Sequence, residues 1–120
     1  MDVTLAELRS RLGEEGLFLV DVRTLQEFQG LAGAPCDPTQ GHITGARSLP
    51  LDRLLECRSG EDVRALVGAP PGSEIVAYCH SGSRSAFAVE LLRDAGYDAR
   101  NYPGSWHEWS RDLSTSLEQP

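Results

Sequence analysis

The sequence predicts an α/β domain in which a mostly parallel central sheet is flanked by helices on both faces. Segments 17–22 (LFLVDV) and 74–79 (EIVAYC) are short and apolar on both faces, as expected of strands buried in a parallel sheet. Segments with helical periodicity alternate with them. Because 120 residues can form one core of this kind but not two, we expect a single domain over residues 1–120, with its core at about 4–113.

Caps and turns mark the elements of the first half. Thr4 and Glu7 have the spacing of a capping box, so a helix is expected to begin there and to end at the glycines that follow. Thr24 is the expected cap of a short helix after the first strand. The Gly- and Pro-rich segment 30–41 is predicted to be a loop, and it is long for so small a domain.

The second half continues the alternation of strands and helices. Trp106 and Trp109 are three residues apart on one helical face, so we expect both to pack in the core. The elements expected here are a brief strand at 46–50, helices at 51–58 and 59–68, the strand at 74–79, a largely apolar helix at 83–96, a strand at 98–102 and a short helix at 105–110.

Composition argues against several classes of protein. The net charge of −7 disfavours a nucleic-acid or anionic-membrane partner, and no apolar stretch is long enough to cross a bilayer. Cys36, Cys57 and Cys79 have no CxxC or zinc-finger spacing and cannot all pair, and the acidic N-terminus is no secretory signal. We therefore expect free thiols in the cytoplasm, with no metal and no cofactor.

The segment 78–85, YCHSGSRS, carries the chemistry. Cys79 ends a predicted parallel strand, where ligands of such sheets bind, and a helix follows at once. Backbone N–H groups and the positive helix end would then face the sulfur and favour the nucleophilic thiolate. His80 and Arg84 add positive charge, the serines add hydroxyl groups, and Gly82 can adopt the positive φ of a tight loop. A small buried hydrophobe is the alternative role for Cys79.

Four segments, taken in order, resemble the single-domain rhodanese family: LVDVRTLQEF, GHITGARSLPL, YCHSGSRSAFAVELLRDAGYD and NYPGSWHEWS. The resemblance implies a rhodanese-like three-layer sandwich. It also implies a sulfurtransferase that moves a sulfane sulfur from thiosulfate or a similar donor to cyanide or a thiol, including the thiol of a protein, through a Cys79 persulfide. The implied substrate-binding residues are His80, Ser81, Gly82, Ser83, Arg84 and Ser85.

Loop length and two departures refine this expectation. Cys79 and Arg84 form a C-x4-R loop, whereas related phosphatases carry C-x5-R, and the shorter loop fits a persulfide better than a phosphate. Many family members have Arg where this chain has His80, and segment 30–41 looks like an insertion. Because family members with a basic loop resemble thiosulfate-using enzymes and those with a neutral loop resemble mercaptopyruvate-using ones, the resemblance favours thiosulfate as the donor. A phosphatase or arsenate reductase of the same fold, or a non-catalytic rhodanese-like binding module, remain as alternatives.

Other polar residues have two readings each. Asp21 and Arg23 could shape the pocket, but a structural ion pair is the favoured role. His42 is expected to lock a loop through a hydrogen bond to the backbone, and His107 to be exposed to solvent. Cys36, in the 30–41 segment, could approach Cys79 as a resolving thiol, although an ordinary loop thiol is favoured.

Overall fold

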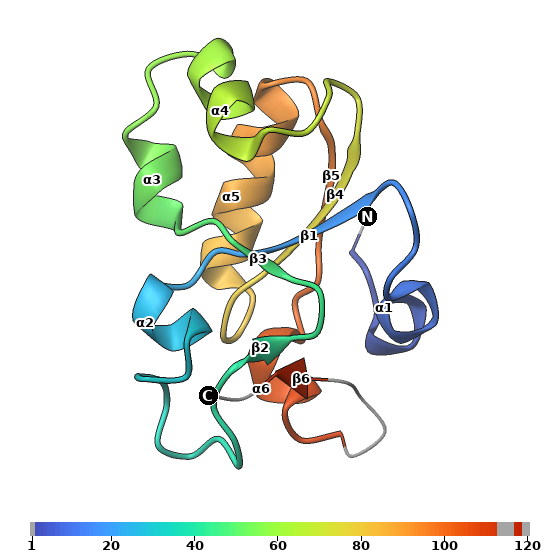
Figure 1. Ribbon diagram of the computed structural model, residues 1–120, viewed down its shortest axis with the longest axis vertical. Coiled ribbons are helices and arrows are strands. Elements are labelled where there is room, and N and C mark those ends of the chain that lie inside the picture. The colour runs from blue at the N-terminus through green and yellow to red at the C-terminus, as the bar shows by residue number, and fades with distance from the viewer. Residues whose placement is uncertain (1, 113–116, 119–120) are drawn as a thin grey trace.

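The central sheet has four parallel strands in the order β3-β1-β4-β5, which confirms the expected α/β class (Figure 1). The computed structural model describes residues 2–112 and 117–118. Within these residues, no helix is both long and apolar enough to cross a bilayer. The strands are β1 (Leu17–Asp21), β3 (Arg47–Ser48), β4 (Glu74–Tyr78) and β5 (Asp98–Asn101).

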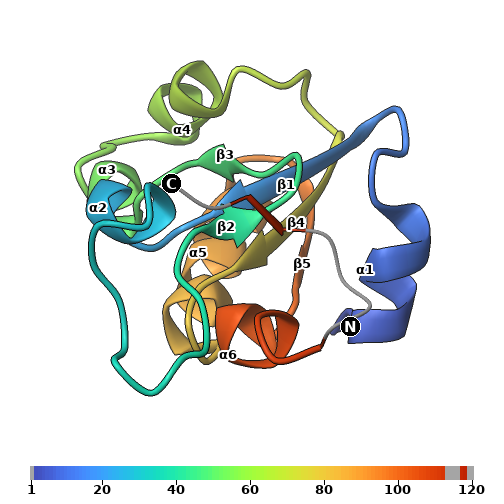
Figure 2. The same cartoon turned by 60° about the horizontal axis from the view of Figure 1, so that its bottom comes forward.

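Helices cover both faces of this sheet, as Figures 1 and 2 show. Alternate residues of β4 face opposite sides: Ile75 and Ala77 join one apolar cluster, and Val76 and Tyr78 join the other. Three layers result, as expected. One face is covered by α3 (Leu51–Leu55), α4 (Gly60–Val67) and α5 (Ser83–Asp94), and the other by α1 (Leu5–Arg11) and α6 (Ser105–Trp109).

The helix caps follow the sequence pattern with one difference. The Thr4 hydroxyl accepts a hydrogen bond from the Glu7 N–H at 3.2 Å, but the Glu7 carboxylate binds the Arg100 guanidinium. The complete capping box lies instead at α2 (Leu25–Phe28), between Thr24 and Glu27. Glu27 is thereby fixed at the carboxyl-end edge of the sheet.

A second, two-stranded antiparallel sheet was not expected from the sequence. It pairs β2 (His42–Ile43) with β6 (Leu117–Glu118). Strands of two residues show no periodicity, so pairing between distant segments alone defines them. Ile43 connects this sheet to the core, because its side chain is fully buried in the apolar cluster that contains Trp106 and Trp109.

Segment 30–41 forms a loop without helix or strand, as predicted. It crosses the carboxyl-end edge of the sheet beside α6 (Figure 2). Its far end is held to that helix because the Trp106 indole N–H donates to the Thr39 carbonyl at 3.1 Å. The side chain of Asp37 is completely buried, which is unusual for a loop carboxylate and calls for partners.

Candidate active site

The loop between β4 and α5 turns at Gly82, which begins the helix with a φ of 98°. That conformation confirms the expected role of the glycine. A side chain here would also collide with its neighbour, because a Cβ would lie 2.8 Å from the Pro103 carbonyl oxygen and 2.9 Å from the Pro103 Cα. Glycine is thus required both by the backbone conformation and by the space available.

The sulfur of Cys79 lies under this loop, and only 1% of the residue is exposed. The Gly82 N–H donates to Sγ at 3.0 Å, and the Ser85 hydroxyl lies 3.4 Å from it. Burial raises the pKa of the Cys79 thiol, but hydrogen bonds from Ser85, Gly82 and Ser81 outweigh burial and lower the pKa below its ordinary value. The loop therefore favours a thiolate, as the sequence predicted.

Ser105 supports the loop from α6, a role that no pattern in the sequence indicates. Its Oγ accepts from the Cys79 N–H at 3.0 Å and donates to the Tyr102 carbonyl at 2.9 Å. Its φ of 55° is the one positive value among the described residues other than glycine. Such strain is maintained only where the surrounding structure imposes it. Here the strained residue, Ser105, holds the N–H of Cys79 at the start of the active loop.

Arg84 is not left unpaired at the mouth of the loop. Its Nη1 lies 2.9 Å from Glu27 Oε1, and its Nη2 lies 3.3 Å from Glu27 Oε2. Burial raises the pKa of Glu27, whereas the hydrogen bonds from Arg84 and from the Thr24 N–H lower it by more, so the pKa lies below its ordinary value. Part of the positive charge expected at the loop is therefore neutralised locally.

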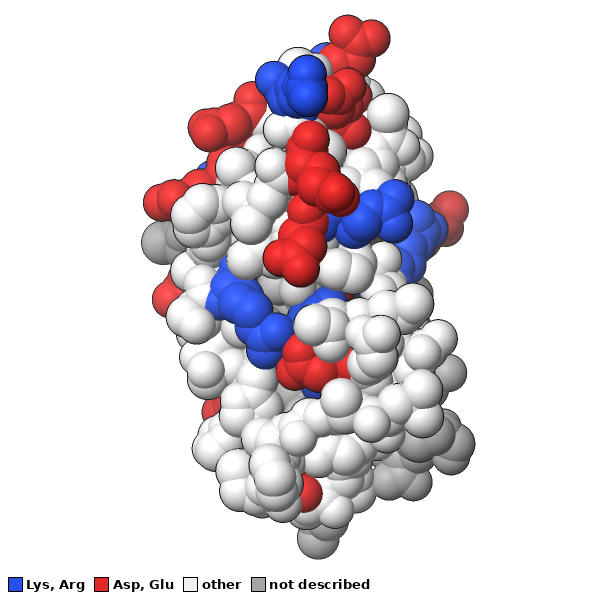
Figure 3. Space-filling view, turned by 90° about the vertical axis from the view of Figure 1, so that its left-hand side faces the viewer, with Lys and Arg blue, Asp and Glu red and all other residues white. Residues whose placement is uncertain are grey.

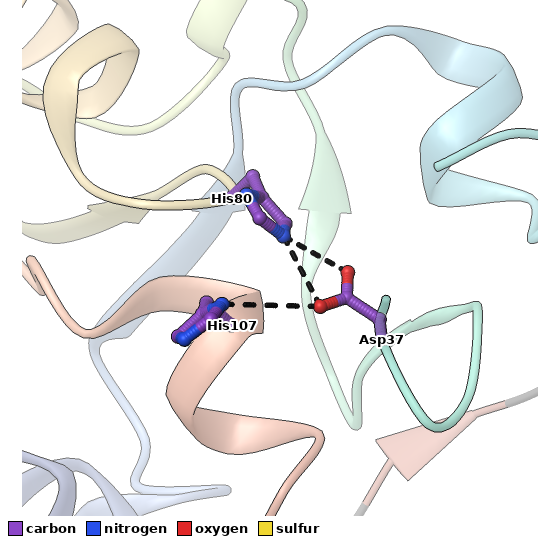
Figure 4. A group of neighbouring side chains, drawn as sticks. All are labelled: Asp37, His80 and His107. Atoms are coloured by element: carbon purple, nitrogen blue, oxygen red, sulfur yellow. Dashed lines mark hydrogen bonds and ion pairs between the residues drawn. The ribbon is translucent and has the colours of Figure 1, made fainter. Parts of the chain in front are cut away.

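His80 is likewise held by a carboxylate. Its Nε2 lies 2.9 Å from Asp37 Oδ2 (Figure 4). Arg111 binds the other oxygen of Asp37 at 2.8 Å. His107, which is half exposed as expected, faces the same carboxylate at 4.0 Å. Segment 30–41 thus reaches the active loop through Asp37, a residue that sequence reasoning did not single out.

The remaining loop serines differ in exposure. Ser81 and Ser83 are exposed, whereas Ser85 is fully buried beneath the loop. Ser81 borders a groove of about 810 Å³ whose other wall is formed by α6 residues, His107 among them. On the opposite side of the loop, Arg84 borders a second hollow of about 520 Å³ lined by apolar side chains such as Leu25 and Leu51.

Both hollows lie within reach of the active loop, on two sides of it. Figure 3 shows the side of the molecule on which α2, α3 and α4 lie. Charges of both signs gather over its upper part, and the lower part carries few. No single sign of charge dominates the described residues of this face, so it would not attract ligands by charge alone.

Asp21 and Arg23 form the structural ion pair that the sequence favoured. Both side chains are buried, Arg23 Nη2 lies 2.7 Å from Asp21 Oδ2, and it also donates to the Gly41 carbonyl. The guanidinium carbon lies 5.1 Å from the ring centroid of Trp106. The pair thereby ties the end of β1 to the end of segment 30–41 and to α6.

His42 and Cys36 were the remaining candidates. The His42 ring stacks on Phe28 with centroids 3.8 Å apart, and its Nδ1 lies 2.8 Å from the Phe28 carbonyl, which confirms a loop-locking role. Cys36 is exposed, and its carbonyl accepts a hydrogen bond from Arg111. Contact between the Cys36 and Cys79 sulfurs stays a prediction.

Comparison with known proteins places these features in a family. The model of the rhodanese-like domain matches residues 4–112. A probable 3-mercaptopyruvate sulfurtransferase of Pseudomonas aeruginosa is 37% identical over 89% of this chain and 40% of its own length. A putative thiosulfate sulfurtransferase, SseB, of Mycobacterium tuberculosis is 36% identical over 83% of this chain and 37% of its own. The chain thus spans 40% or less of these two curated relatives.

Solved structures agree on the fold. The crystal structure of a probable thiosulfate sulfurtransferase superimposes with a TM-score of 0.81 at 41% identity, over 96% of this chain and 47% of that one. The anaerobic ergothioneine biosynthesis enzyme of Chlorobium limicola gives 0.86 at 22% identity, over 99% of this chain and 28% of that one, and shows the fold alone. This chain, with its active loop at the end of β4, belongs to the rhodanese-like domain family.

Proposed function

We propose that this domain transfers a sulfane sulfur through a persulfide on Cys79. The observation that carries the proposal is the environment of Sγ, which receives the Gly82 N–H at 3.0 Å and lies 3.4 Å from the Ser85 hydroxyl. These donors lower the pKa of the thiol. The backbone N–H groups of residues 80–84 would stabilise the outer sulfur of a persulfide anion. The names of relatives at 36% and 37% identity support the same reaction class.

The reaction takes two displacement steps. The Cys79 thiolate attacks the outer sulfur of thiosulfate, the S–S bond breaks, and sulfite leaves with the bonding electron pair. A nucleophilic acceptor then attacks the outer sulfur of the Cys79 persulfide and releases the thiolate. Cyanide would give thiocyanate, and a thiolate would give a new persulfide. Neither step changes the net redox state or needs a cofactor.

Thiosulfate is the proposed sulfur donor because the loop offers N–H groups that can bind an oxyanion. Arg84 has five N–H groups, and its contacts to Glu27 leave some of them to bind the sulfonate end of thiosulfate. The Pseudomonas relative is named for 3-mercaptopyruvate, so donor choice is the finer part of the proposal. A relative in Thermus thermophilus, 37% identical over 76% of this chain, is named a sulfur carrier protein, which supports a protein thiol as acceptor.

A reducing compartment, the cytoplasm, suits this chemistry. Cys36, Cys57 and Cys79 are all free thiols. An oxidising compartment would expose Cys36, in particular, to disulfide formation. We therefore place the reaction where thiol acceptors are abundant.

Intact-mass spectrometry after treatment with thiosulfate tests the proposal. The protein is expected to gain one sulfur atom, to lose it on addition of cyanide, and to release thiocyanate. Cys79→Ser should gain nothing, whereas the matched Cys57→Ser variant should gain the sulfur as wild type does. Failure of wild type to gain sulfur, together with turnover of a phosphate ester, would favour the phosphatase alternative. Failure of both reactions would favour a binding module.

A further inference from the structure

Three potential metal ligands meet beside the active loop (Figure 4). Asp37 comes from segment 30–41, His80 follows the catalytic cysteine, and His107 comes from α6. One ligand atom from each lies within 4.8 Å of the other two. Because each residue comes from a different segment, the cluster shows no metal-ligand spacing along the chain. The expectation of a domain without metal was based on that spacing alone.

The geometry is close to that of a coordination sphere. Ligands at about 2.0 Å from a tetrahedral zinc ion lie about 3.3 Å from one another. His80 Nε2 and Asp37 Oδ2 are 2.9 Å apart, and His107 Nδ1 lies 4.0 Å from Asp37 Oδ1. The two imidazole rings are 5.5 Å apart at an angle of 83°, so they do not stack on each other. Small side-chain movements would bring all three atoms to one ion.

We propose that Asp37, His80 and His107 form a binding site for a divalent late first-row transition ion, of which Zn²⁺ is the representative. Two imidazole nitrogens and one carboxylate oxygen form a ligand set that suits such ions, whereas Mg²⁺ and Ca²⁺ favour oxygen ligands alone. Three protein ligands would leave a further coordination position open. His107 and Ser81 both border the 810 Å³ groove, so that position can face a water molecule or an anionic ligand there.

Arg111 is compatible with this site although it is a cation. It donates to Asp37 Oδ1 at 2.8 Å, whereas His80 lies nearest to Oδ2. A carboxylate has about four lone-pair sites, so the guanidinium and a metal ion can use different lone pairs of the same carboxylate. Arg111 also donates to the His107 carbonyl at 2.7 Å and thereby fixes α6 relative to Asp37. Such contacts outside the coordination sphere orient the ligands of metal sites. The Arg111 guanidinium would also repel the bound cation to some extent.

Metal binding would act on the active loop through His80. The ion would join the residue after Cys79 to segment 30–41 and to α6, and would add positive charge near the loop. The site uses no atom of Cys79, so its existence does not depend on the sulfur-transfer proposal.

The first test measures Zn²⁺ affinity by competition with a chromogenic chelator, with thiols kept reduced by a phosphine. Wild type is expected to bind one Zn²⁺. His107→Ala removes a half-exposed ligand that the core does not need, and it should weaken binding at least about tenfold. Asp37→Asn should weaken binding as well. His42→Gln is the matched control, because it removes a histidine outside the cluster, and it should bind as wild type does.

The second test identifies the ligand atoms by loading Co²⁺ and recording its spectrum. Visible d–d bands without a thiolate-to-cobalt charge-transfer band are expected, and both should be unchanged in Cys79→Ser. A charge-transfer band that disappears in Cys79→Ser or Cys36→Ser would place the ion on sulfur and overturn the proposal. Equal zinc affinity in wild type and His107→Ala, or no binding by wild type at micromolar zinc, would overturn it too.

Discussion

The properties of single residues in the active loop depend on hydrogen bonds and backbone geometry more than on formal charge. The two basic side chains of the loop, His80 and Arg84, are each bound by a carboxylate. The pKa of Cys79 is instead lowered by the hydroxyl and backbone groups around its sulfur. Substitutions of uncharged residues should therefore have the clearest effects on the nucleophile.

Ser85→Ala should raise the pKa of Cys79, because it removes the side-chain donor that favours the thiolate while burial continues to oppose it. The thiolate is the reactive form above the pKa, so the acid limb of the kcat/KM profile should move to higher pH. The ultraviolet absorbance of the thiolate, titrated directly, checks the shift. Ser83→Ala, an exposed serine of the same turn, should leave the pKa of Cys79 unchanged; an equal shift in both variants would contradict the assignment.

Gly82→Ala should destabilise the fold more than Gly96→Ala does. Both glycines have a φ of 98°, so both variants carry the same backbone strain, of about 1 kcal/mol or more. Only Gly82 also has Pro103 within 3 Å of a new Cβ, whereas nothing lies within 4 Å at Gly96. Urea unfolding of the two variants measures the difference. Equal losses would mean that the Pro103 contact relaxes freely.

At the scale of elements, short helices at the carboxyl-end edge connect to the active loop. The capping box of α2 holds Glu27, and Glu27 holds Arg84 in the first turn of α5. The carboxylate is mostly buried and Arg84 is about one-third exposed, so the pair has a modest effect on stability. Its larger effect should be on how much of the guanidinium is available to a donor.

Two substitutions in this pair should change donor use in opposite directions. Arg84→Ala should raise the KM for thiosulfate, because a charge-assisted contact contributes about 1.5–3 kcal/mol. Glu27→Gln should lower the KM, because it removes the anion that competes for Arg84. Steady-state kinetics with thiosulfate and cyanide gives both values. An increase of KM in both variants would show that the Glu27–Arg84 ion pair holds the shape of the loop instead of competing with thiosulfate.

At the scale of the whole molecule, buried polar contacts join the layers. Asp21 and Arg23 are both buried at the end of β1, and Arg23 reaches the Gly41 carbonyl and the Trp106 ring. This places one guanidinium between the sheet, segment 30–41 and α6. Because all three meet at the active loop, global stability and site geometry depend on the same contact.

Asp21→Asn should destabilise the protein by about 3–5 kcal/mol, because it leaves the buried guanidinium of Arg23 without its counter-charge. Glu7→Gln is the surface control: it breaks the more exposed ion pair with Arg100 and should cost much less, because solvent screens that pair. Chemical denaturation of both variants checks the order. A loss at Asp21 no larger than at Glu7 would show that water or another group replaces the missing charge.

The sequence by itself determined the layers and the residues that form the loop between β4 and α5. Strands apolar on both faces can only lie inside a covered sheet, and residues 79–85 are contiguous, so their turn and helix place them together. The cap at Thr24 and the packing of Trp106 and Trp109 follow from similarly local patterns.

Only the tertiary structure decided which distant residues complete the site. Asp37 and His80 are 43 positions apart, Glu27 and Arg84 are 57 apart, and Cys79 and Ser105 are 26 apart. Each contact joins segments that meet only because parallel strands bring their carboxyl ends to one edge. The two-residue strands β2 and β6 also form only through pairing across the chain. The local sequence pattern decides which helix, strand or loop carries a side chain. The packing of the whole chain decides which distant group that side chain contacts.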